Sequence, residues 1–278
     1  FQALPGRRGS NLTFARLAIP LLYPSERIIY MDCDVLCLKG LEEFHRANDF
    51  NRAIVAVKDP LKVCRRDKTL REWMPPHQLN QPYFNAGILL LNGSVINQSD
   101  FEKKIEELTQ KSNHPRYVDQ TYLNFLFHDS WEEIPAENNF ILTMEQTTSF
   151  CTVPRAANLH YVGSKKPWSP GMTSFYRYVP EKLWSLFLPL LDSNETTTVC
   201  IDQKHYRKAL AKSIIYRLWH WQRAAAYRAG LNVFSQYETQ GIHAFKKELL
   251  ASKTIAPGLR DFLLSEADKS KLQTPPRD

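Results

Sequence analysis

The pattern of apolar and polar positions alternates along the first 170 residues between short apolar runs and stretches of helical character. The apolar runs have the length of β-strands and are bounded by polar or turn-forming residues; they lie at 28–31, 53–57 and 84–91. A further short strand is predicted at 158–162. The stretches of helical character lie at 12–22, 41–48, 99–111 and 118–127. Ser10 is placed to cap the first of these helices, and Pro24 follows its end. This alternation predicts an α/β sheet domain.

Three stretches interrupt the alternation. Residues 60–80 carry Pro60, Pro75 and Pro76 among many charges, which predicts an irregular excursion from the domain. The sequence GSKKPWSPG at 163–171 predicts a loop, and the polar stretch at 193–199 predicts a linker.

Beyond this linker, residues 201–230 contain almost no helix breakers and predict one long helix that ends at Gly230. At about 100° per residue, its larger apolar side chains share one arc. The arc comprises Tyr206, Leu210, Ile214, Leu218 and Trp221. The opposite side carries Lys204, Lys208, Lys212 and Arg223. Arg207 and Arg217 intrude on the apolar arc, so the predicted helix is imperfectly amphipathic.

Composition and charge separate the two parts of the chain further. Of the 278 residues, 43% are apolar and 23% are charged, which suits a folded globular protein. Residues 1–200 balance 22 Lys and Arg against 22 Asp and Glu, whereas residues 201–278 carry 14 against 7. The net charge of +7 therefore lies in the last third of the chain. A neutral N-terminal part followed by a basic C-terminal part indicates two roles.

The expected compartment is the cytoplasm. No apolar run approaches the roughly 20 residues that a membrane span requires, and no secretory signal precedes the first helix. The five cysteines form no CxxC pair and no zinc-like spacing, which fits a reducing compartment. They are Cys33, Cys37, Cys64, Cys151 and Cys200.

Two carboxylates, Asp32 and Asp34, directly follow the apolar run at 28–31. In an extended chain, residues two positions apart point to the same side, so both acids are expected to face one point at the end of the strand. Ligands bind at that end of the strands in open α/β sheets, and two like charges so close together favour a divalent cation. Two classes share this pattern: phosphohydrolases with a nucleophilic Asp, and glycosyltransferases that bind a nucleotide-sugar diphosphate through a metal.

The rest of the sequence favours the glycosyltransferase class. A phosphohydrolase requires a later Asp-Asp or Gly-Asp pair, and neither dipeptide occurs. The polar groups that a nucleotide sugar requires are available in three later segments: YFNAGILLLN at 83–92, VDQTYLN at 118–124 and LHYVGSKKPW at 159–168.

Taken in order, TFARL, IIYMDCDVL, YFNAGILLLN, DQ and HYVGSKKPW resemble glycosyltransferase family 8, the retaining enzymes of the GT-A fold. The resemblance covers about residues 10–170 and is greatest to the lipopolysaccharide core glucosyl- and galactosyltransferases of Gram-negative bacteria. It implies a catalytic domain at 1–192 and a basic helical C-terminal domain at 193–278. The family's first strand lies well before TFARL, so roughly two βα units of its catalytic domain are expected to be missing here.

The resemblance also implies roles for individual residues. Asp32 and Asp34 match the family's Mn²⁺- or Mg²⁺-binding DxD, and His160 matches the third metal ligand. Asp119 and Gln120 match the residues that hold the transferred sugar, with Gln120 nearest its reactive face, and are the catalytic candidates. The other expected donor-binding residues are Arg16, Cys33, Asn85, Ala86, Gly87, Gly163 and Lys166.

The implied function is transfer of a hexose from UDP-glucose or UDP-galactose to the lipopolysaccharide core, with retention. Either a double displacement or a same-face mechanism satisfies this. The basic helix is expected to bind the anionic inner face of the inner membrane; alternatively, its apolar arc packs on the catalytic domain. A second interpretation of the chain is a non-catalytic protein that keeps the fold and binds membrane or lipopolysaccharide. Nucleic-acid binding is disfavoured, since no recognition motif accompanies the basic charge.

Overall fold

The structure of the chain is a computed structural model that describes residues 12–39, 51–110, 117–142, 156–163, 166–168, 171–173, 199–201 and 203–215, with single positions between and beyond these ranges. Contacts group the chain into two compact units. The first comprises residues 1–33 and 41–139, and the second comprises residues 34–40 and 140–278. The predicted domain boundary at residue 192 lies outside the described residues and stays a prediction.

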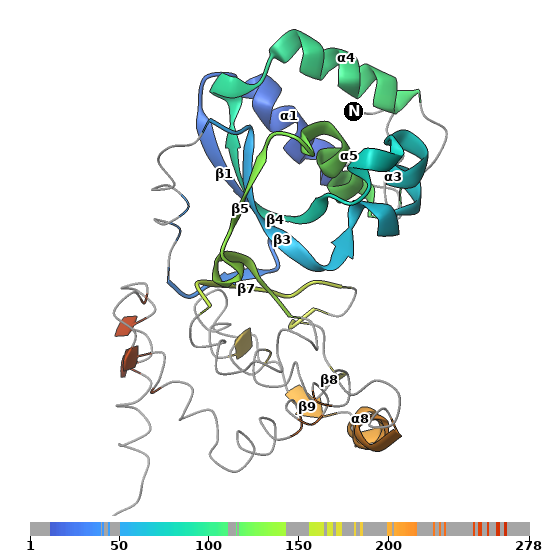
Figure 1. Cartoon of the computed structure of the whole chain (residues 1–278). Coiled ribbons are helices and arrows are strands. Elements are labelled where there is room, and N and C mark those ends of the chain that lie inside the picture. The colour runs from blue at the N-terminus through green and yellow to red at the C-terminus, as the bar shows by residue number, and fades with distance from the viewer. Residues whose placement is uncertain are drawn as a thin grey trace, which may run out of the picture. The chain divides into compact units, whose positions relative to one another are not determined.

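The first unit is built on a four-stranded sheet with the order β1-β4-β3-β5 (Figure 1). Its strands are β1 (Arg27–Met31), β3 (Ile54–Val63), β4 (Pro82–Asn92) and β5 (Trp131–Ile134). β4 runs antiparallel to both β1 and β3, while β5 runs parallel to β3. The predicted strands at 28–31, 53–57 and 84–91 are confirmed. β4 is buried from Tyr83 onward, as its long apolar run requires of a central strand.

The helices of this unit agree with the apolar spacing. α1 (Ala15–Leu22) follows a 3-10 turn at Leu12–Phe14, α4 spans Gln98–Thr109, and α5 spans Val118–Phe127. Ser10, the expected cap of the first helix, lies outside the described residues. These helices share a core with the sheet (Figure 1), because Leu17, Phe101 and Tyr122 pack with residues of β3 and β4. Only Leu41 and Phe44 of the predicted helix at 41–48 are described.

The prediction of an irregular excursion at 60–80 was wrong. β3 continues to Val63, and short helices follow: 3-10 turns at Cys64–Arg66 and Pro76–Gln78, with α3 (Lys68–Trp73) between them. The buried carboxylate of Asp67 begins α3, since its Oδ1 accepts hydrogen bonds from the N–H groups of Thr69 (2.9 Å) and Leu70 (3.4 Å). Its Oδ2 accepts hydrogen bonds from the hydroxyls of Thr121 (2.6 Å) and Tyr83 (3.3 Å). One acid thus fixes this segment to α5 and β4.

Asp67→Ala is therefore expected to lower the free energy of unfolding by about 3 kcal/mol, since it removes a cap and leaves two buried hydroxyls without their acceptor. Asn97→Ala is the matched control, because Asn97 caps α4 through the Asp100 N–H at 3.2 Å from an exposed position. The control should cost only about 1 kcal/mol. Urea unfolding measures both, and equal losses would contradict a structural role for the Asp67 contacts beyond capping.

The second unit contains two small sheets. β2 (Val35–Cys37), β7 (Asn158–His160) and β6 (Phe140–Ile141) form one in the order β2-β7-β6, with β7 antiparallel to β2 and parallel to β6. β8 (Gly171–Thr173) and β9 (Val199–Ile201) pair in parallel. The predicted strand at 158–162 is therefore confirmed for its first three residues. The predicted linker lies outside the described residues, except Val199, which begins β9.

The described part of the long C-terminal helix is α8 (Gln203–Ile215). Leu210 and Ile214, two members of the predicted apolar arc, are 47% and 67% exposed, whereas Ala209 and Ser213 are buried. In the described part of α8, the buried side chains are therefore small ones, while Leu210 and Ile214 of the arc are exposed. Tyr206 is half-buried, and the alternative in which the whole arc packs on the catalytic domain stays a prediction. Residues 216–224 lie outside the described residues. Within the described chain, we find no helix with the length and hydropathy to span a membrane.

Candidate active site

The sequence had suggested that the two aspartates share one extended strand, but in the structure they do not. β1 ends at Met31, and Cys33 and Asp34 form a turn. The backbone N–H of Asp32 donates a hydrogen bond to the carbonyl of Gly87 on β4, at 2.8 Å. Alternation along a strand therefore does not explain the placement of the two acids, and each carboxylate has its own partners in its own unit.

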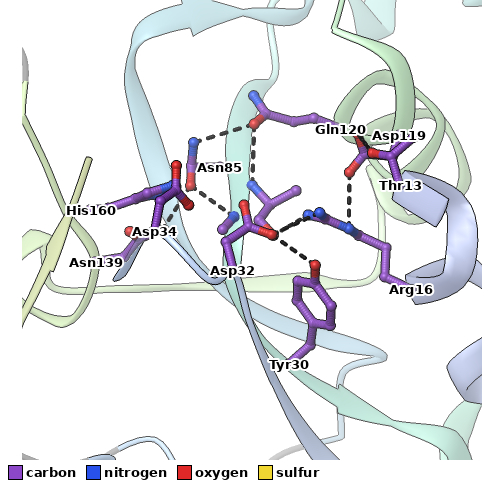
Figure 2. A network of polar contacts seen from close by, with 12 residues as sticks. Thr13, Arg16, Tyr30, Asp32, Asp34, Asn85, Asp119, Gln120, Asn139 and His160 are labelled. Carbon is purple, nitrogen blue, oxygen red and sulfur yellow. Dashed lines mark hydrogen bonds and ion pairs between the residues drawn. The ribbon is translucent and has the colours of Figure 1, made fainter. Parts of the chain in front are cut away.

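In the first unit, the buried guanidinium of Arg16 on α1 joins two acids (Figure 2). Its NH2 atom lies 2.7 Å from Asp32 Oδ1, and its Nε lies 2.9 Å from Asp119 Oδ2. Its NH1 atom donates to the carbonyl of Ala86 at 2.7 Å. A single buried cation thus compensates two carboxylates and fixes both against β4, as buried charges require.

Two hydroxyls complete the partners of these acids. Tyr30 donates to Asp32 Oδ1 at 2.7 Å, and Thr13 donates to Asp119 Oδ1 at 2.8 Å. Burial raises the pKa of Tyr30 above its ordinary value, so the phenol keeps its proton and remains a donor. Burial also raises the pKa of Asp119, against the opposing charge of Arg16. The Tyr30 ring lies 4.3 Å from the guanidinium carbon of Arg16 in a cation–π contact.

Amide groups form the next part of the network. Gln120 Oε1 accepts hydrogen bonds from Asn85 Nδ2 at 3.2 Å and from the backbone N–H of Ala86 at 3.3 Å. Asn85 Oδ1 accepts from the N–H of Gly87 at 2.9 Å. The structure therefore brings together residues of β4 and α5 that the sequence resemblance placed around one sugar.

The backbone is strained beside this group. Val118, which directly precedes Asp119 and Gln120, has a φ of +45°, an uncommon conformation for a β-branched residue. Such outliers cluster at functional sites, where the surrounding structure holds them in place. The strain therefore marks the start of α5 as a site where position matters more than local stability.

Four residues of the network were missed at the sequence level. Tyr30 and Thr13 contact the two acids, Asp59 on β3 accepts a hydrogen bond from Gln120 Nε2 at 3.2 Å, and Asn139 donates to Asn85 Oδ1 at 2.8 Å. Asp59 follows an apolar run as Asp32 does, and this signal was available in the sequence. Nothing local in the sequence distinguishes Asn139.

The second unit contributes Asp34, His160 and Lys166. The register of β2 with β7 pairs Val35 with His160, and His160 Nε2 lies 3.5 Å from Asp34 Oδ1. The Lys166 ammonium bonds Asp34 Oδ2 and donates to the carbonyl of Tyr161 at 3.1 Å. Burial disfavours the Asp34 carboxylate, but hydrogen bonds and charge from His160 and Lys166 outweigh it and lower the pKa of Asp34 to about 2. Asp34 is therefore ionised at neutral pH.

The loop between His160 and Lys166 turns at Gly163, whose φ of +99° lies in the region that only glycine adopts readily. A Cβ there would meet no atom within 4 Å, so the backbone conformation, rather than space, requires glycine. Cys33 is exposed. Among the residues that the structure describes, no side-chain contact of Cys33 supports its expected role in donor binding, which stays a prediction.

Among the described residues, Asp32, Asp34 and His160 form a group of the types that hold a metal ion. Two carboxylates with one imidazole nitrogen suit Mn²⁺ better than Mg²⁺, which prefers oxygen ligands. Asp34 is in the ionised form that ligation requires. The chemistry of this donor set therefore fits a divalent cation.

The family described as Glycosyl transferase family 8 matches residues 2–170. Glycosyltransferase GlyA of Streptococcus pneumoniae is 26% identical over 212 residues, which are 74% of this chain and 27% of that protein. Lipopolysaccharide 1,2-glucosyltransferase of Escherichia coli is 28% identical over 152 residues, which are 51% of this chain and 44% of that protein. The chain thus spans less than half the length of either relative. The crystal structure of an active-site mutant of LgtC shares the fold, with a TM-score of 0.50 and 22% identity over 73% of this chain and 74% of that chain.

Proposed function

The chain belongs to glycosyltransferase family 8, and we propose that it transfers glucose or galactose from the UDP-sugar to a lipopolysaccharide core with retention of anomeric configuration. The observation that carries this proposal is the buried network in which Arg16 joins Asp32 and Asp119 beside Gln120. Buried carboxylates and amides aimed at one place suit recognition of sugar hydroxyls. The name of the Escherichia coli relative supports the acceptor.

We assign Asp32, Asp34 and His160 as the ligands of Mn²⁺ or Mg²⁺. A divalent cation held there would supply Lewis-acid stabilisation of the leaving diphosphate. Lys166 adds a positive charge beside Asp34, and Gly163 allows the loop before it to turn. Both features suit diphosphate binding. The exposed Cys33 is assigned to the donor through its position between the two acids.

The donor sugar is assigned to the first unit. Arg16 and the backbone at Ala86 and Gly87 hold Asp32 and Asn85 in place, and Asp119 offers carboxylate oxygens to sugar hydroxyls. Gln120 Oε1 already accepts two hydrogen bonds, which lowers its nucleophilicity. This arrangement favours the same-face mechanism over a double displacement through Gln120. The acceptor hydroxyl then attacks the anomeric carbon and gives its proton to the departing phosphate.

The function is tested by incubating the full-length protein with radiolabelled UDP-glucose or UDP-galactose and truncated lipopolysaccharide cores. The expected result is label in one core acceptor from one of the two donors. Binding of lipopolysaccharide without transfer from either donor would support the non-catalytic interpretation instead.

We further propose that α8 holds the protein at the anionic cytoplasmic face of the inner membrane. Lys204, Lys208 and Lys212 are exposed, and so are the apolar side chains of Leu210 and Ile214. Basic residues near an anionic surface contribute about 1 kcal/mol each, and exposed apolar side chains on such a helix suit insertion among headgroups.

Reversing Lys204, Lys208 and Lys212 to Glu is expected to weaken binding to anionic vesicles at least about 100-fold, because about 3 kcal/mol of attraction becomes repulsion. Co-sedimentation with phosphatidylglycerol vesicles measures it. The matched control reverses Arg71, Lys103 and Lys104, which are exposed on α3 and α4, and should leave binding unchanged. If both variants lose vesicle binding equally, the effect comes from net charge alone and not from α8. If neither variant loses vesicle binding, a membrane role for α8 is excluded.

A further inference from the structure

We propose that Asp59 is a positioning residue for Gln120: its carboxylate fixes which way the Gln120 side-chain amide is turned. The catalytic consequence of this inference rests on the proposed function, in which Gln120 lies beside the reacting sugar. The geometric part concerns only contacts within the first unit.

One side of the Gln120 amide faces Asp59. Asp59 lies on β3, is only 4% exposed and accepts a hydrogen bond from Gln120 Nε2 through its Oδ2 at 3.2 Å. An ionised carboxylate only accepts hydrogen bonds. The amide nitrogen, rather than the amide oxygen, must therefore face Asp59.

The other side of the amide faces donors. Gln120 Oε1 accepts from Asn85 Nδ2 at 3.2 Å and from the backbone N–H of Ala86 at 3.3 Å, and a backbone N–H only donates. A flipped amide would set its oxygen against Asp59 and its NH₂ against the Ala86 N–H. Two fixed groups of opposite kind thus select one of the two orientations.

The orientation of the Asn85 side-chain amide is fixed in the same way. Asn85 Oδ1 accepts hydrogen bonds from the N–H of Gly87 at 2.9 Å and from Nδ2 of the buried Asn139 at 2.8 Å, which leaves the Asn85 NH₂ directed at Gln120 (Figure 2). A single direction of donation therefore runs from Asn139 through Asn85 to Gln120, and Gln120 in turn donates to Asp59. Connected buried hydrogen bonds of this kind reinforce one another.

Orientation matters because an amide presents either an acceptor or a donor to whatever lies beside it. A glutamine that flips freely would present the wrong group to the sugar for part of the time. The carboxylate of Asp59 removes this alternative before substrate binds, which is preorganisation of the site. A purely structural role, in which Asp59 only attaches α5 to the sheet, makes a different prediction.

The kinetic test is Asp59→Asn in the full-length protein, since asparagine has the same size and presents either an oxygen or a nitrogen to Gln120. We expect kcat for UDP release from UDP-glucose or UDP-galactose to fall about 10- to 100-fold, with KM changed less than about threefold. In a Gln120→Ala background, the same substitution should change kcat less than about twofold, because the residue on which it acts is absent. If Asp59→Asn lowers kcat by the full 10- to 100-fold in the Gln120→Ala background as well, the positioning role is overturned.

A readout independent of activity is the side-chain amide NMR signal of Gln120, assigned by its disappearance in Gln120→Ala. In the wild type, exchange of its protons with solvent should be slowed at least about tenfold relative to exposed glutamines, and Asp59→Ala should remove this protection. Asp67→Asn is the matched control, since it alters a buried acid that contacts Thr121 and not the Gln120 side chain. Retained protection in Asp59→Ala would overturn the inference. Lost protection in a protein that turns over neither UDP-sugar would support the geometry and contradict the proposed function.

Discussion

Asp34→Ala is expected to abolish metal-dependent nucleotide binding by the full-length protein. The substitution removes an ionised carboxylate that we propose as a metal ligand, and with it the negative charge that lies between His160 and the Lys166 ammonium. A cation would then approach a site with excess positive charge. The affinity for UDP in the presence of Mn²⁺ should fall more than about 100-fold, measured by calorimetric titration.

The matched control is Asp129→Ala. Asp129 also pairs with a histidine, His128, at 2.8 Å, but it is exposed and belongs to the first unit, whereas Asp34 belongs to the second. Nucleotide binding should be unchanged in this variant. If UDP binds the wild-type protein equally well in EDTA, the assignment of Asp32, Asp34 and His160 as metal ligands is wrong.

Gln120→Ala is expected to lower kcat about 10²- to 10³-fold while KM changes less than about threefold. In the proposed function, Gln120 lies beside the reacting carbon. A residue there acts mainly in the transition state, so its loss appears in turnover rather than in donor binding. The buried amide is held by Asn85, Ala86 and Asp59 before substrate arrives, which makes such an effect larger than that of a mobile side chain.

Steady-state kinetics of UDP release measures this effect. Gln81→Ala is the matched control, because the half-buried Gln81 bonds the exposed Asp129 of the same unit, and its turnover should equal that of the wild type. If Gln120→Ala instead raises KM while kcat stays near the wild-type value, Gln120 is only a binding residue.

The sequence predicted the helices and strands that are determined by residues close together in the chain. Apolar runs of four or more residues became β1, β3 and β4, and the helical spacing at 118–127 became α5. It missed α3 because the acid that begins this helix is fixed by Thr121 and Tyr83, which are distant in sequence. It missed the very short strands β2 and β6, since runs of two or three residues carry no clear period.

The C-terminal helix shows a second limit of prediction from the sequence. The apolar arc predicted from Leu210 and Ile214 assumed that the larger apolar side chains are those that pack. In the structure, the small residues Ala209 and Ser213 are buried instead. A pattern of hydrophobic size alone cannot identify such a face.

In the candidate site, Arg16, Asn85, Asp119 and Gln120 lie in one network of contacts. Their expected roles toward a sugar donor stay predictions. The expectation that alternation along one strand places Asp32 and Asp34 on the same side was wrong, since a turn rather than a strand separates them. Asn139 was missed because its role depends on a hydrogen bond to a residue 54 positions away, which no local pattern reveals. Asp59 was missed although it follows an apolar run, and its partner Gln120 lies 61 positions away.

We propose that this chain carries the site of a metal-dependent UDP-sugar transferase, and the decisive measurement is UDP release with and without divalent metal. The full-length protein, freed of metal with EDTA, is assayed with UDP-glucose and with UDP-galactose before and after addition of Mn²⁺. The account predicts turnover of one donor that is lost in EDTA and restored by Mn²⁺. Equal turnover in EDTA, or no turnover of either donor with Mn²⁺ present, would contradict it.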